Sequence, residues 1–331
     1  MKPKIAVTMG DPSGIGPEIV ALAMTSDKIY KVARPVVIGS KNLIYNFVKS
    51  YDLDVEVNSY KNDKNLFFSP NIINVIEPYD LHPDQVVAGK IQKISGAASY
   101  KFIAKATELI LSGELDAMAT APIHKEALKL AGIPQAGCTE ILGDLTDTGE
   151  PLTMFEVDNL RIFFHSRHVS LKESIELVRK DRLIYMIRRS VKALEKIGVK
   201  HETFAVAGLN PHCSDGGLFG NEEAQEIIPA VKALQKEGYN ILGPIGADSV
   251  FHLAKENNWD GVLSLYHDQG HIASKTLDFY GTVSVTLDLP FIRSSVDHGT
   301  AFDIAGQKKA NPASMEQAIL TAANYARYYN Q

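Results

Sequence analysis

Short apolar runs alternate with longer amphipathic segments along most of the chain. The run IAVTM at residues 5–9 is typical of a buried strand, and the segment from Pro17 to Met24 is predicted as a helix because proline is favoured in a first helical turn. Residues 171–197 are predicted as one helix or two. Together these elements indicate α/β layers around a largely parallel sheet. The same alternation predicts further strands at 36–39, 116–120, 160–164, 203–207, 261–265 and 283–287, and further helices at 41–49, 94–111, 222–237 and 312–329.

The length of 331 residues predicts about two domains. A stretch containing glycine and proline, residues 131–136, follows a predicted helix and marks the division. We expect residues 1–130 together with 300–331 to form the first domain, and residues 131–299 to form the second. The closing helix would then pack back on the first domain.

The composition narrows the class of protein. Hydrophobic residues make up 45% and charged residues 22% of the chain, as in a soluble globular protein. The net charge of −5 argues against a nucleic-acid partner, and no apolar stretch approaches the roughly 20 residues of a membrane-spanning helix. The start of the chain has no signal-peptide pattern, and Cys138 and Cys213 form no CxxC pair. We therefore expect a cytoplasmic protein without structural disulfides.

Three histidines follow predicted strands, namely His168, His212 and His267. In open α/β sheets ligands bind beyond the carboxyl ends of the strands, so three imidazoles there could hold one divalent transition metal. Such a metal lowers the pKa of a bound alcohol. A single histidine is more often a satisfied structural residue, and His271, which is close to His267 in the sequence, is an alternative ligand. We interpret His298 as a possible neighbour of the ligands.

Charged side chains near these histidines are candidates for binding and proton transfer. Lys275 and Arg293 are candidate anion ligands, because ammonium and guanidinium groups bind phosphate and carboxylate, although a structural salt bridge is equally compatible with Arg293. Asp248 and Asp268 could take a proton, ligate the metal or orient a histidine. Thr139 could offer a hydroxyl to a substrate.

Two glycine-containing segments carry less specific signals. Residues 10–18 (GDPSGIGPE) form a turn between a strand and a helix, but they match neither a GxGxxG fingerprint nor a Walker loop. A Rossmann-type NAD site is therefore not predicted. Residues 216–220 are glycine-rich, and the acids that follow them, Glu222 and Glu223, are interpreted as first-turn residues of a helix.

Several of these blocks, in this order, resemble the 4-hydroxythreonine-4-phosphate dehydrogenase family over nearly the whole chain. The matching segments are 10–18, 120–122 (TAP), 208–212 (GLNPH), 266–270 (YHDQG) and 293–306. The resemblance implies two α/β/α domains with a cleft between them, related to isopropylmalate dehydrogenase. It also implies a homodimer whose active site is completed across the interface.

The resemblance further implies an NAD-dependent oxidation of a phosphorylated 3-hydroxy acid, followed by loss of carbon dioxide, with a divalent cation (zinc, cobalt, manganese or magnesium) as cofactor. The family's metal ligands correspond to His168, His212 and His267. Its substrate contacts correspond to Thr139, Lys275 and Arg293, and to the positions of Cys138 and Ser284.

The last two positions depart from the family pattern, in which histidine usually precedes Thr139 and asparagine usually replaces Ser284. The chemistry should survive these changes, but the choice of substrate is open. The leading hypothesis is 4-hydroxythreonine 4-phosphate, in pyridoxal phosphate biosynthesis. The alternative is D-threonate or D-erythronate 4-phosphate, which would give dihydroxyacetone phosphate. Two other classes stay open, a metal-assisted hydrolase and a phosphate-ligand binding protein without catalysis; a nucleophilic Cys138 is disfavoured.

Overall fold

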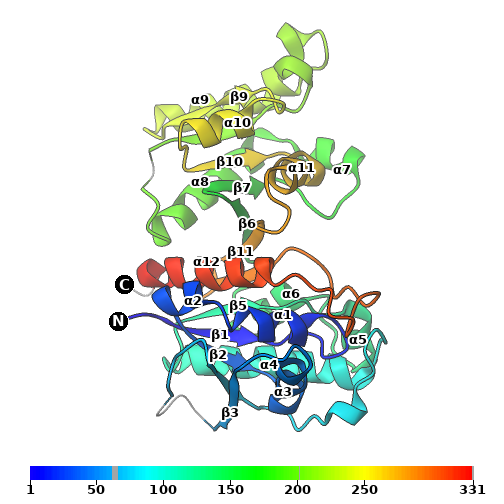
Figure 1. Cartoon of the computed structure of the whole chain (residues 1–331). Helices are drawn as coiled ribbons and strands as arrows, with labels where there is room; N and C mark the ends of the chain where they lie inside the picture. Colours follow the sequence, from blue (N-terminus) through cyan, green and yellow to red (C-terminus); the bar gives the residue numbers. More distant parts are fainter. Residues whose placement is uncertain (62–65, 201, 330–331) are drawn as a thin grey trace. The chain divides into compact units, whose positions relative to one another are not determined.

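The computed structural model of the protein describes residues 1–61, 66–200 and 202–329. The chain divides into two compact units, of which the first comprises Met1–Pro151 and Val283–Gln331 and the second comprises Leu152–Thr282. Figure 1 shows the elements of both units. Each unit contains a mostly parallel sheet with helices against it, so the predicted α/β class is confirmed.

The first unit is built around strands in the order β3-β4-β2-β1-β5-β12-β11. Neighbours in this order pair in parallel, except β11 and β12, which are antiparallel. The strands are β1 (Lys4–Thr8), β2 (Arg34–Ile38), β3 (Glu56–Tyr60), β4 (Ile72–Ile76), β5 (Ala117–Thr120), β11 (Val283–Leu287) and β12 (Arg293–Val296).

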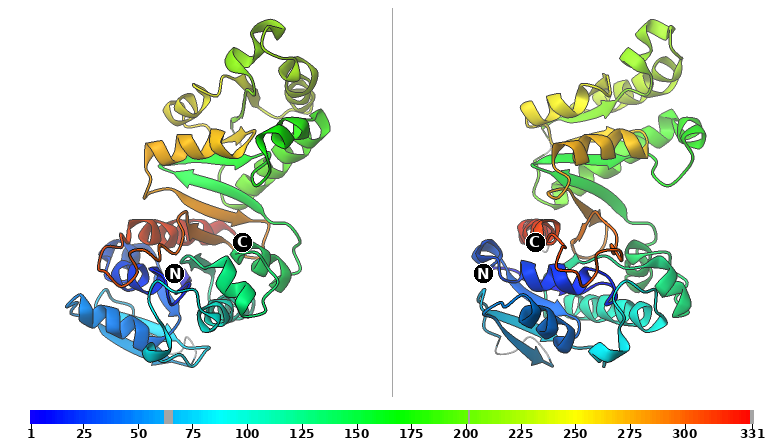
Figure 2. Two further views of the ribbon diagram at one scale, coloured as in Figure 1. Left: turned by 90° about the vertical axis from the view of Figure 1, so that its right-hand side faces the viewer. Right: turned by 45° about the vertical axis from the view of Figure 1, so that its right-hand side comes forward.

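Helices cover both faces of this sheet, as the two views in Figure 2 show. Helix α4 packs on β1, β2 and β5 with α5 and α6 beside it, whereas α12 packs on β1, β5, β11 and β12 with α1 and α2 beside it. The helices of the unit are α1 (Gly16–Ala23), α2 (Asp27–Val32), α3 (Lys41–Ser50), the 3-10 turn η1 (Pro83–Gln85), α4 (Lys93–Leu111), α5 (Lys125–Leu130), α6 (Cys138–Leu145) and α12 (Ala313–Tyr329).

The second unit has the strand order β6-β7-β10-β8-β9, with β6 and β7 antiparallel and the other neighbours parallel. Its strands are β6 (Leu152–Val157), β7 (Leu160–Phe164), β8 (Phe204–Ala207), β9 (Ile241–Ile245) and β10 (Gly261–Ser264). Its helices are α7 (Leu171–Leu177), α8 (Lys180–Lys196), the 3-10 segment η2 (Pro211–Gly217), the π-helix η3 (Glu223–Ile227), α9 (Ile228–Lys236), α10 (Val250–Glu256) and α11 (His267–Leu277).

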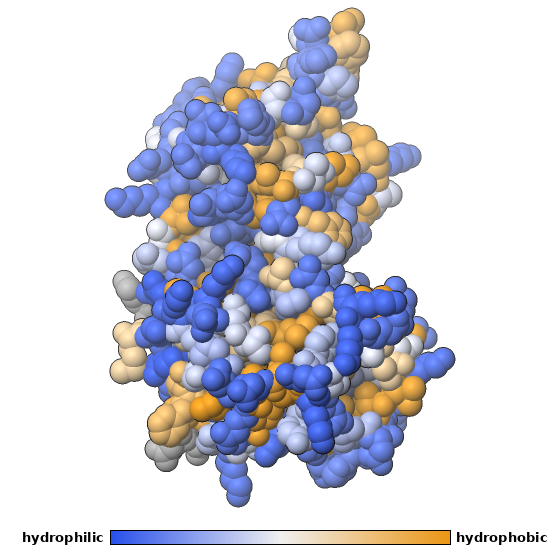
Figure 3. Space-filling model, viewed as in Figure 1, coloured by the Kyte–Doolittle hydropathy of each residue, from blue (hydrophilic) through white to orange (hydrophobic). Residues whose placement is uncertain are grey.

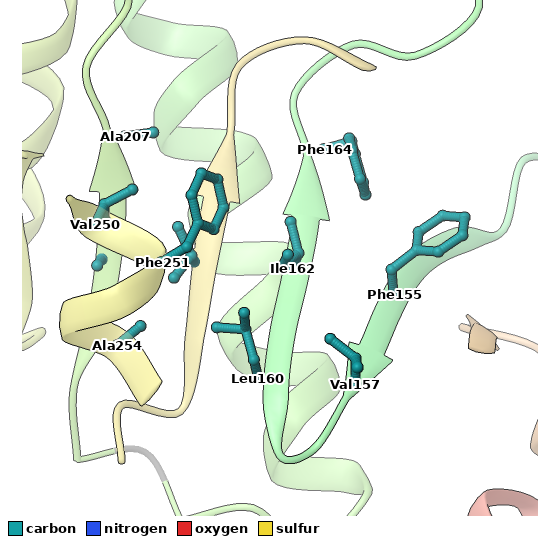
Figure 4. Packing of buried hydrophobic residues seen from close by; sticks show 11 residues of the cluster. Phe155, Val157, Leu160, Ile162, Phe164, Ala207, Val250, Phe251 and Ala254 are labelled. Atoms are coloured by element: carbon teal, nitrogen blue, oxygen red, sulfur yellow. The ribbon is translucent and has the colours of Figure 1, made fainter. Parts of the chain in front are cut away.

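The second unit has a hydrophobic core of its own, which Figure 4 shows from close by. Ile162 of β7 and Val262 of β10 are completely buried, and Val250, Phe251 and Ala254 of α10 pack on the same face of the sheet. This packing fixes α10 against β7, β8 and β10. The helix therefore packs on all three strands that the candidate histidines follow.

The division of the chain differs from the expected one at 131 and 299. Helix α6 and strands β11 and β12 belong to the first unit, because the unit boundaries follow Pro151 and Thr282. The physical reason is strand pairing: β12 pairs in parallel with β5, and β11 pairs with β12, so both stay with the first sheet. A glycine and a proline at residues 132–134 mark only a turn after α5.

The predicted elements are otherwise found within a residue or two, but several elements were not predicted. The stretch 171–197 is two helices, α7 and α8. The stretch predicted as one helix at 222–237 begins with the π-helical turn η3. Helix α11, which follows β10 directly, was missed. None of the helices in the described ranges is long and apolar enough to cross a bilayer.

Candidate functional site

The three candidate histidines follow three strands that are neighbours in the second unit. His168 follows β7, His212 follows β8, and His267 is the first residue of α11 after β10. The order β7-β10-β8 is parallel throughout, so the carboxyl ends of these strands lie at the same edge of the sheet. The prediction that the histidines follow strands is confirmed, and this edge is where open α/β sheets bind ligands.

Two of these imidazoles lie close together. The ring centroids of His168 and His267 are 6.0 Å apart. With metal–nitrogen bonds of about 2 Å, two imidazoles on one cation have centroids roughly 5–6 Å apart, so this pair fits a shared cation. Among the residues that the structure describes, however, no group of three or more His, Cys, Asp or Glu side chains is arranged so that it could hold a metal ion. The three-histidine site therefore stays a prediction.

Helix α11 carries several candidates on one face. Nδ1 of His267 lies 2.7 Å from Oδ1 of Asp268, an arrangement in which a carboxylate orients an imidazole. The ring of His271 packs 4.1 Å from that of His267 and also contacts Phe155 and Phe164. Burial, followed by the nearby charges, lowers the pKa of His271 to about 4. His271 is therefore neutral at physiological pH, and its half-buried ring packs on two aromatic side chains of the core.

The remaining acidic and basic candidates of the second unit lie near the same histidines. Lys275 is two turns after His267 on α11, and its Nζ lies 5.1 Å from the centre of the Phe279 ring. Asp248 lies exposed in the segment after β9. Burial raises the pKa of the thiol of Cys213, the neighbour of His212, and the nearby carboxylates of Glu223 and Asp248 raise it further.

A buried carboxylate, Glu223, organises the loop that carries His212, although its sequence position is typical of a helix-start residue. Glu223 is 1% exposed and accepts hydrogen bonds from the backbone amides of Leu209 and Asn210. Burial on its own would raise the pKa of Glu223, but hydrogen bonds from Asn210 and Ser214 lower it. Glu223 is therefore ionised at neutral pH.

The first unit contains a buried guanidinium. Arg293, on β12, is 7% exposed. Its Nε and Nη2 donate to the hydroxyl of Thr120, at 3.0 and 2.7 Å, and its Nη1 donates to Thr286 at 3.1 Å. The partners that the described part of the chain gives Arg293 are neutral hydroxyls, not carboxylates. A buried cation without an anion is costly, and the binding of an anionic ligand by Arg293 stays a prediction.

Cys138 lies beside this guanidinium. The thiol begins α6 and interacts with Thr120 and Arg293. Burial raises the pKa of Cys138, and the opposing effect of Arg293 does not offset it. The side chain is therefore a neutral thiol rather than a nucleophilic thiolate, which agrees with the interpretation as an inert cysteine.

The other predicted substrate contacts of this unit lie on the same elements. Thr139 is the second residue of α6, and Ser284 pairs in register with Ser295 across β11 and β12. Thr120 and Thr286 had not been singled out, although Thr120 begins the TAP block at residues 120–122. Only the strand pairing reveals that these hydroxyls hold the guanidinium.

The glycine-rich turn after β1 contains a second buried charge. Asp11 is fully buried, and its Oδ1 accepts a hydrogen bond from the amide of Ser13 at 2.8 Å, while Oδ2 has no partner among the described residues. The turn packs tightly on the TAP block: a Cβ on Gly10 would lie 2.5 Å from the carbonyl oxygen of Pro122. The turn therefore supports the segment that carries Thr120.

Asp11 predicts a pH dependence of stability. Burial raises the pKa of Asp11 from 3.8 to about 6 in the folded protein. The folded state thus binds the proton more tightly, and stability is lost as the pH rises from about 4 to 6, by at most ~3 kcal/mol. We expect the Asp11→Asn variant to gain that amount relative to the wild type between pH 4 and pH 7 in urea unfolding. The exposed Asp84→Asn should show no such gain, and equal pH profiles for all three proteins would contradict the assignment.

A family sequence model, relatives of similar length and solved structures all indicate one protein family. The sequence model of the pyridoxal phosphate biosynthetic protein PdxA matches residues 31–322. A relative from Clostridium botulinum is 49% identical over 98% of this chain and 97% of its own length. Another from Halalkalibacterium halodurans is 49% identical over 99% and 98%. Both are provisionally named D-threonate 4-phosphate dehydrogenase.

Solved structures agree with the fold. A 4-hydroxythreonine-4-phosphate dehydrogenase from Klebsiella pneumoniae superposes with a TM-score of 0.88, at 38% identity, covering 98% of this chain and all of that one. One from Burkholderia phymatum gives a TM-score of 0.85 at 36% identity, covering 98% of each chain. The matched model, the relatives and the structures all extend over nearly the whole length, and the chain belongs to the PdxA family of dehydrogenases.

Proposed function

We propose that this dehydrogenase oxidises the 3-hydroxyl of D-threonate 4-phosphate with NAD. The resulting 3-keto acid loses carbon dioxide to give dihydroxyacetone phosphate. The observation that carries the proposal is the buried Arg293, which has only neutral partners among the described residues and is suited to bind a phosphate or carboxylate. The names of the relatives at 49% identity favour the threonate ester.

The two candidate substrates differ in the group that carbon 2 carries. 4-Hydroxythreonine 4-phosphate carries an ammonium there and D-threonate 4-phosphate a hydroxyl. Cys138 is a neutral thiol, and Ser284 is a short hydroxyl, so both favour an uncharged, hydroxylated neighbour. 4-Hydroxythreonine 4-phosphate is the second candidate, supported by the names of the structural neighbours.

The proposed residue roles follow from charge and position. Arg293 and Lys275 bind the anionic groups, and Thr139 donates a hydrogen bond to the substrate. Asp268 and Asp248 are the proposed acceptors for the proton that leaves the hydroxyl as hydride moves to NAD. After decarboxylation a proton must return to carbon, and Lys275 is the proposed donor.

His168, His212 and His267 are the proposed ligands of a divalent cation such as zinc, cobalt, manganese or magnesium. When bound, such a cation makes the substrate hydroxyl more acidic and stabilises negative charge on oxygen. The carboxylate of Asp268 holds Nδ1 of His267 and leaves Nε2 to face a ligand.

Association of two copies is the proposed oligomeric state. Exposed apolar side chains lie on α7, on α11 and in the glycine-rich segment 216–220, and apolar surface is visible over these elements in Figure 3. Such a patch is typical of an interface rather than of a free surface. Its residues are Leu171, Ile175, Leu218, Phe219 and Ile272, with exposed fractions of 60%, 38%, 72%, 47% and 65%.

A substrate panel tests the proposal. NADH formation is measured with D-threonate, D-erythronate and 4-hydroxythreonine 4-phosphates, with NAD and with NADP, before and after chelation of divalent metals. We expect the highest kcat/KM with D-threonate 4-phosphate and NAD, and loss of activity after chelation. A preference for 4-hydroxythreonine 4-phosphate would establish the second candidate. Phosphate release without NAD, or ligand binding without turnover, would replace the proposal by a hydrolase or a binding protein.

A further inference from the structure

The segment after β8 has an unusual backbone. His212, Cys213, Ser214 and Asp215 have φ angles of 52°, 54°, 69° and 43°, so four consecutive residues with side chains adopt the left-handed conformation. This conformation costs roughly 1–2 kcal/mol for each such residue. It persists only where the surroundings determine it, and strain of this kind concentrates at functional sites.

Glu223 accepts four hydrogen bonds from this segment and the residues before it. Its Oε1 accepts the amides of Leu209 at 2.8 Å and Asn210 at 2.7 Å. Its Oε2 accepts Nδ2 of Asn210 at 2.8 Å and the hydroxyl of Ser214. These donors lie on both sides of His212 in the sequence, so one buried carboxylate ties the residues before the strained segment to Ser214 within it.

Only a carboxylate of this length satisfies all four donors. An ionised glutamate is an acceptor at both oxygens, whereas glutamine would direct an NH₂ group at donors already present. An aspartate would be one methylene short. The π-helical start of η3 places Glu223 at this position, and π-helical turns are frequently found at functional sites.

We propose that Glu223 is a positioning residue that holds the left-handed loop so that His212 is presented at the carboxyl edge of β8. The carboxylate does not touch the reacting groups; it acts through the backbone that carries the imidazole. The role of His212 in turnover rests on the proposed function. The anchoring of the loop rests on the contacts of Glu223 alone.

The test compares Glu223→Gln with Glu222→Gln. Glu222 is the matched control, because it is the neighbouring carboxylate and is only half-buried. It accepts one side-chain hydrogen bond from Asn210, at 2.8 Å, and the amide of Asn221, but no backbone amide of residues 209–215. The side-chain oxygen of glutamine can still accept from Asn210. In Glu223→Gln we expect faster hydrogen exchange at the amides of residues 209, 210 and 212–215. We also expect kcat to fall about 10- to 100-fold, the effect typical of residues that orient ligands, with little change in KM. Glu222→Gln should change neither quantity appreciably.

A second variant keeps the test decisive if Glu223→Gln does not fold. Ser214→Ala removes one of the four donors, and it should give a smaller increase in exchange and a smaller loss of kcat. Unchanged hydrogen exchange and kcat in Glu223→Gln would overturn the proposal, and so would a rise in KM with constant kcat. If Glu223→Gln does not fold, the same outcomes in Ser214→Ala decide. If the wild type turns over none of the phosphorylated acids, the proposed function fails, and the exchange measurement alone decides whether Glu223 anchors the loop.

Discussion

Replacing His212 by alanine is expected to abolish NADH formation while leaving the fold intact. The imidazole lies at the carboxyl edge of three parallel strands, where it is proposed to bind the cation that acidifies the substrate hydroxyl. Loss of that effect corresponds to several kcal/mol, and hence to a fall in kcat on the order of 10³-fold. Steady-state kinetics measures the fall, and calorimetric titration with Mn²⁺ measures the accompanying loss of metal affinity.

The control for His212 is another histidine of the same unit. His252 is exposed on α10 and is not among the proposed ligands, and His252→Ala should retain wild-type kinetics and Mn²⁺ affinity. The circular dichroism spectra of both variants should match that of the wild type. Wild-type turnover in His212→Ala would remove this histidine from the proposed site.

Replacing Arg293 by methionine is expected to separate activity from stability. The guanidinium is buried without a carboxylate partner among the described residues, so the free protein bears the cost of desolvating it. Removing a buried charge in favour of an apolar group of similar size is often neutral or stabilising. We therefore expect a free energy of unfolding equal to or above that of the wild type.

The same Arg293→Met variant should bind and convert the substrate with a much lower kcat/KM. Truncating one partner of a buried charge pair costs about 2–5 kcal/mol, which predicts a fall in kcat/KM of roughly 30- to several thousand-fold. The kcat/KM of Arg293→Lys should lie between those of the wild type and Arg293→Met, because lysine keeps the charge but not the two-pronged geometry. Urea unfolding and kinetics on the same preparations give both quantities. A variant that loses stability but binds substrate normally would assign Arg293 a structural role.

Much of the fold could be predicted because its strands are apolar on both faces. In β1, Ile5, Ala6 and Val7 are all completely buried, and in β10 so are Val262 and Leu263. Such runs identify buried parallel strands from sequence alone. The positions of the candidate histidines just after such strands could be predicted for the same reason.

Helix α11 shows what the pattern could not reveal. Its buried face consists of Gln269, Gly270 and Ser274, so it has no apolar stripe. Gly270 is needed because a Cβ there would lie 2.6 Å from the ring of Phe164. A helix that approaches the sheet this closely is recognised only once the strand beneath it is in place. Its start at His267 was therefore invisible in the sequence.

Long-range contacts account for the rest of the candidate site. Cys138 and Arg293 meet because β12 returns to pair with β5, a pairing that no local signal specifies. Glu223 was interpreted from its neighbours as a helix-start residue, and its role in the His212 loop depends on four donors that the folded chain brings to it. Sequence patterns identified many of the side chains but not their partners.

The return of the chain to its first sheet has a consequence for synthesis. Strand β5 ends at Thr120, yet its neighbour β12 and the covering helix α12 are translated only after the entire second unit. Until β12 and α12 leave the ribosome, one edge of β5 lacks its partner and the apolar face beneath α12 is uncovered. The second unit, whose chain is continuous, has no such delay. An incomplete chain therefore carries an open strand edge, the feature most prone to wrong pairing, and pulse proteolysis of stalled chains would register when it closes.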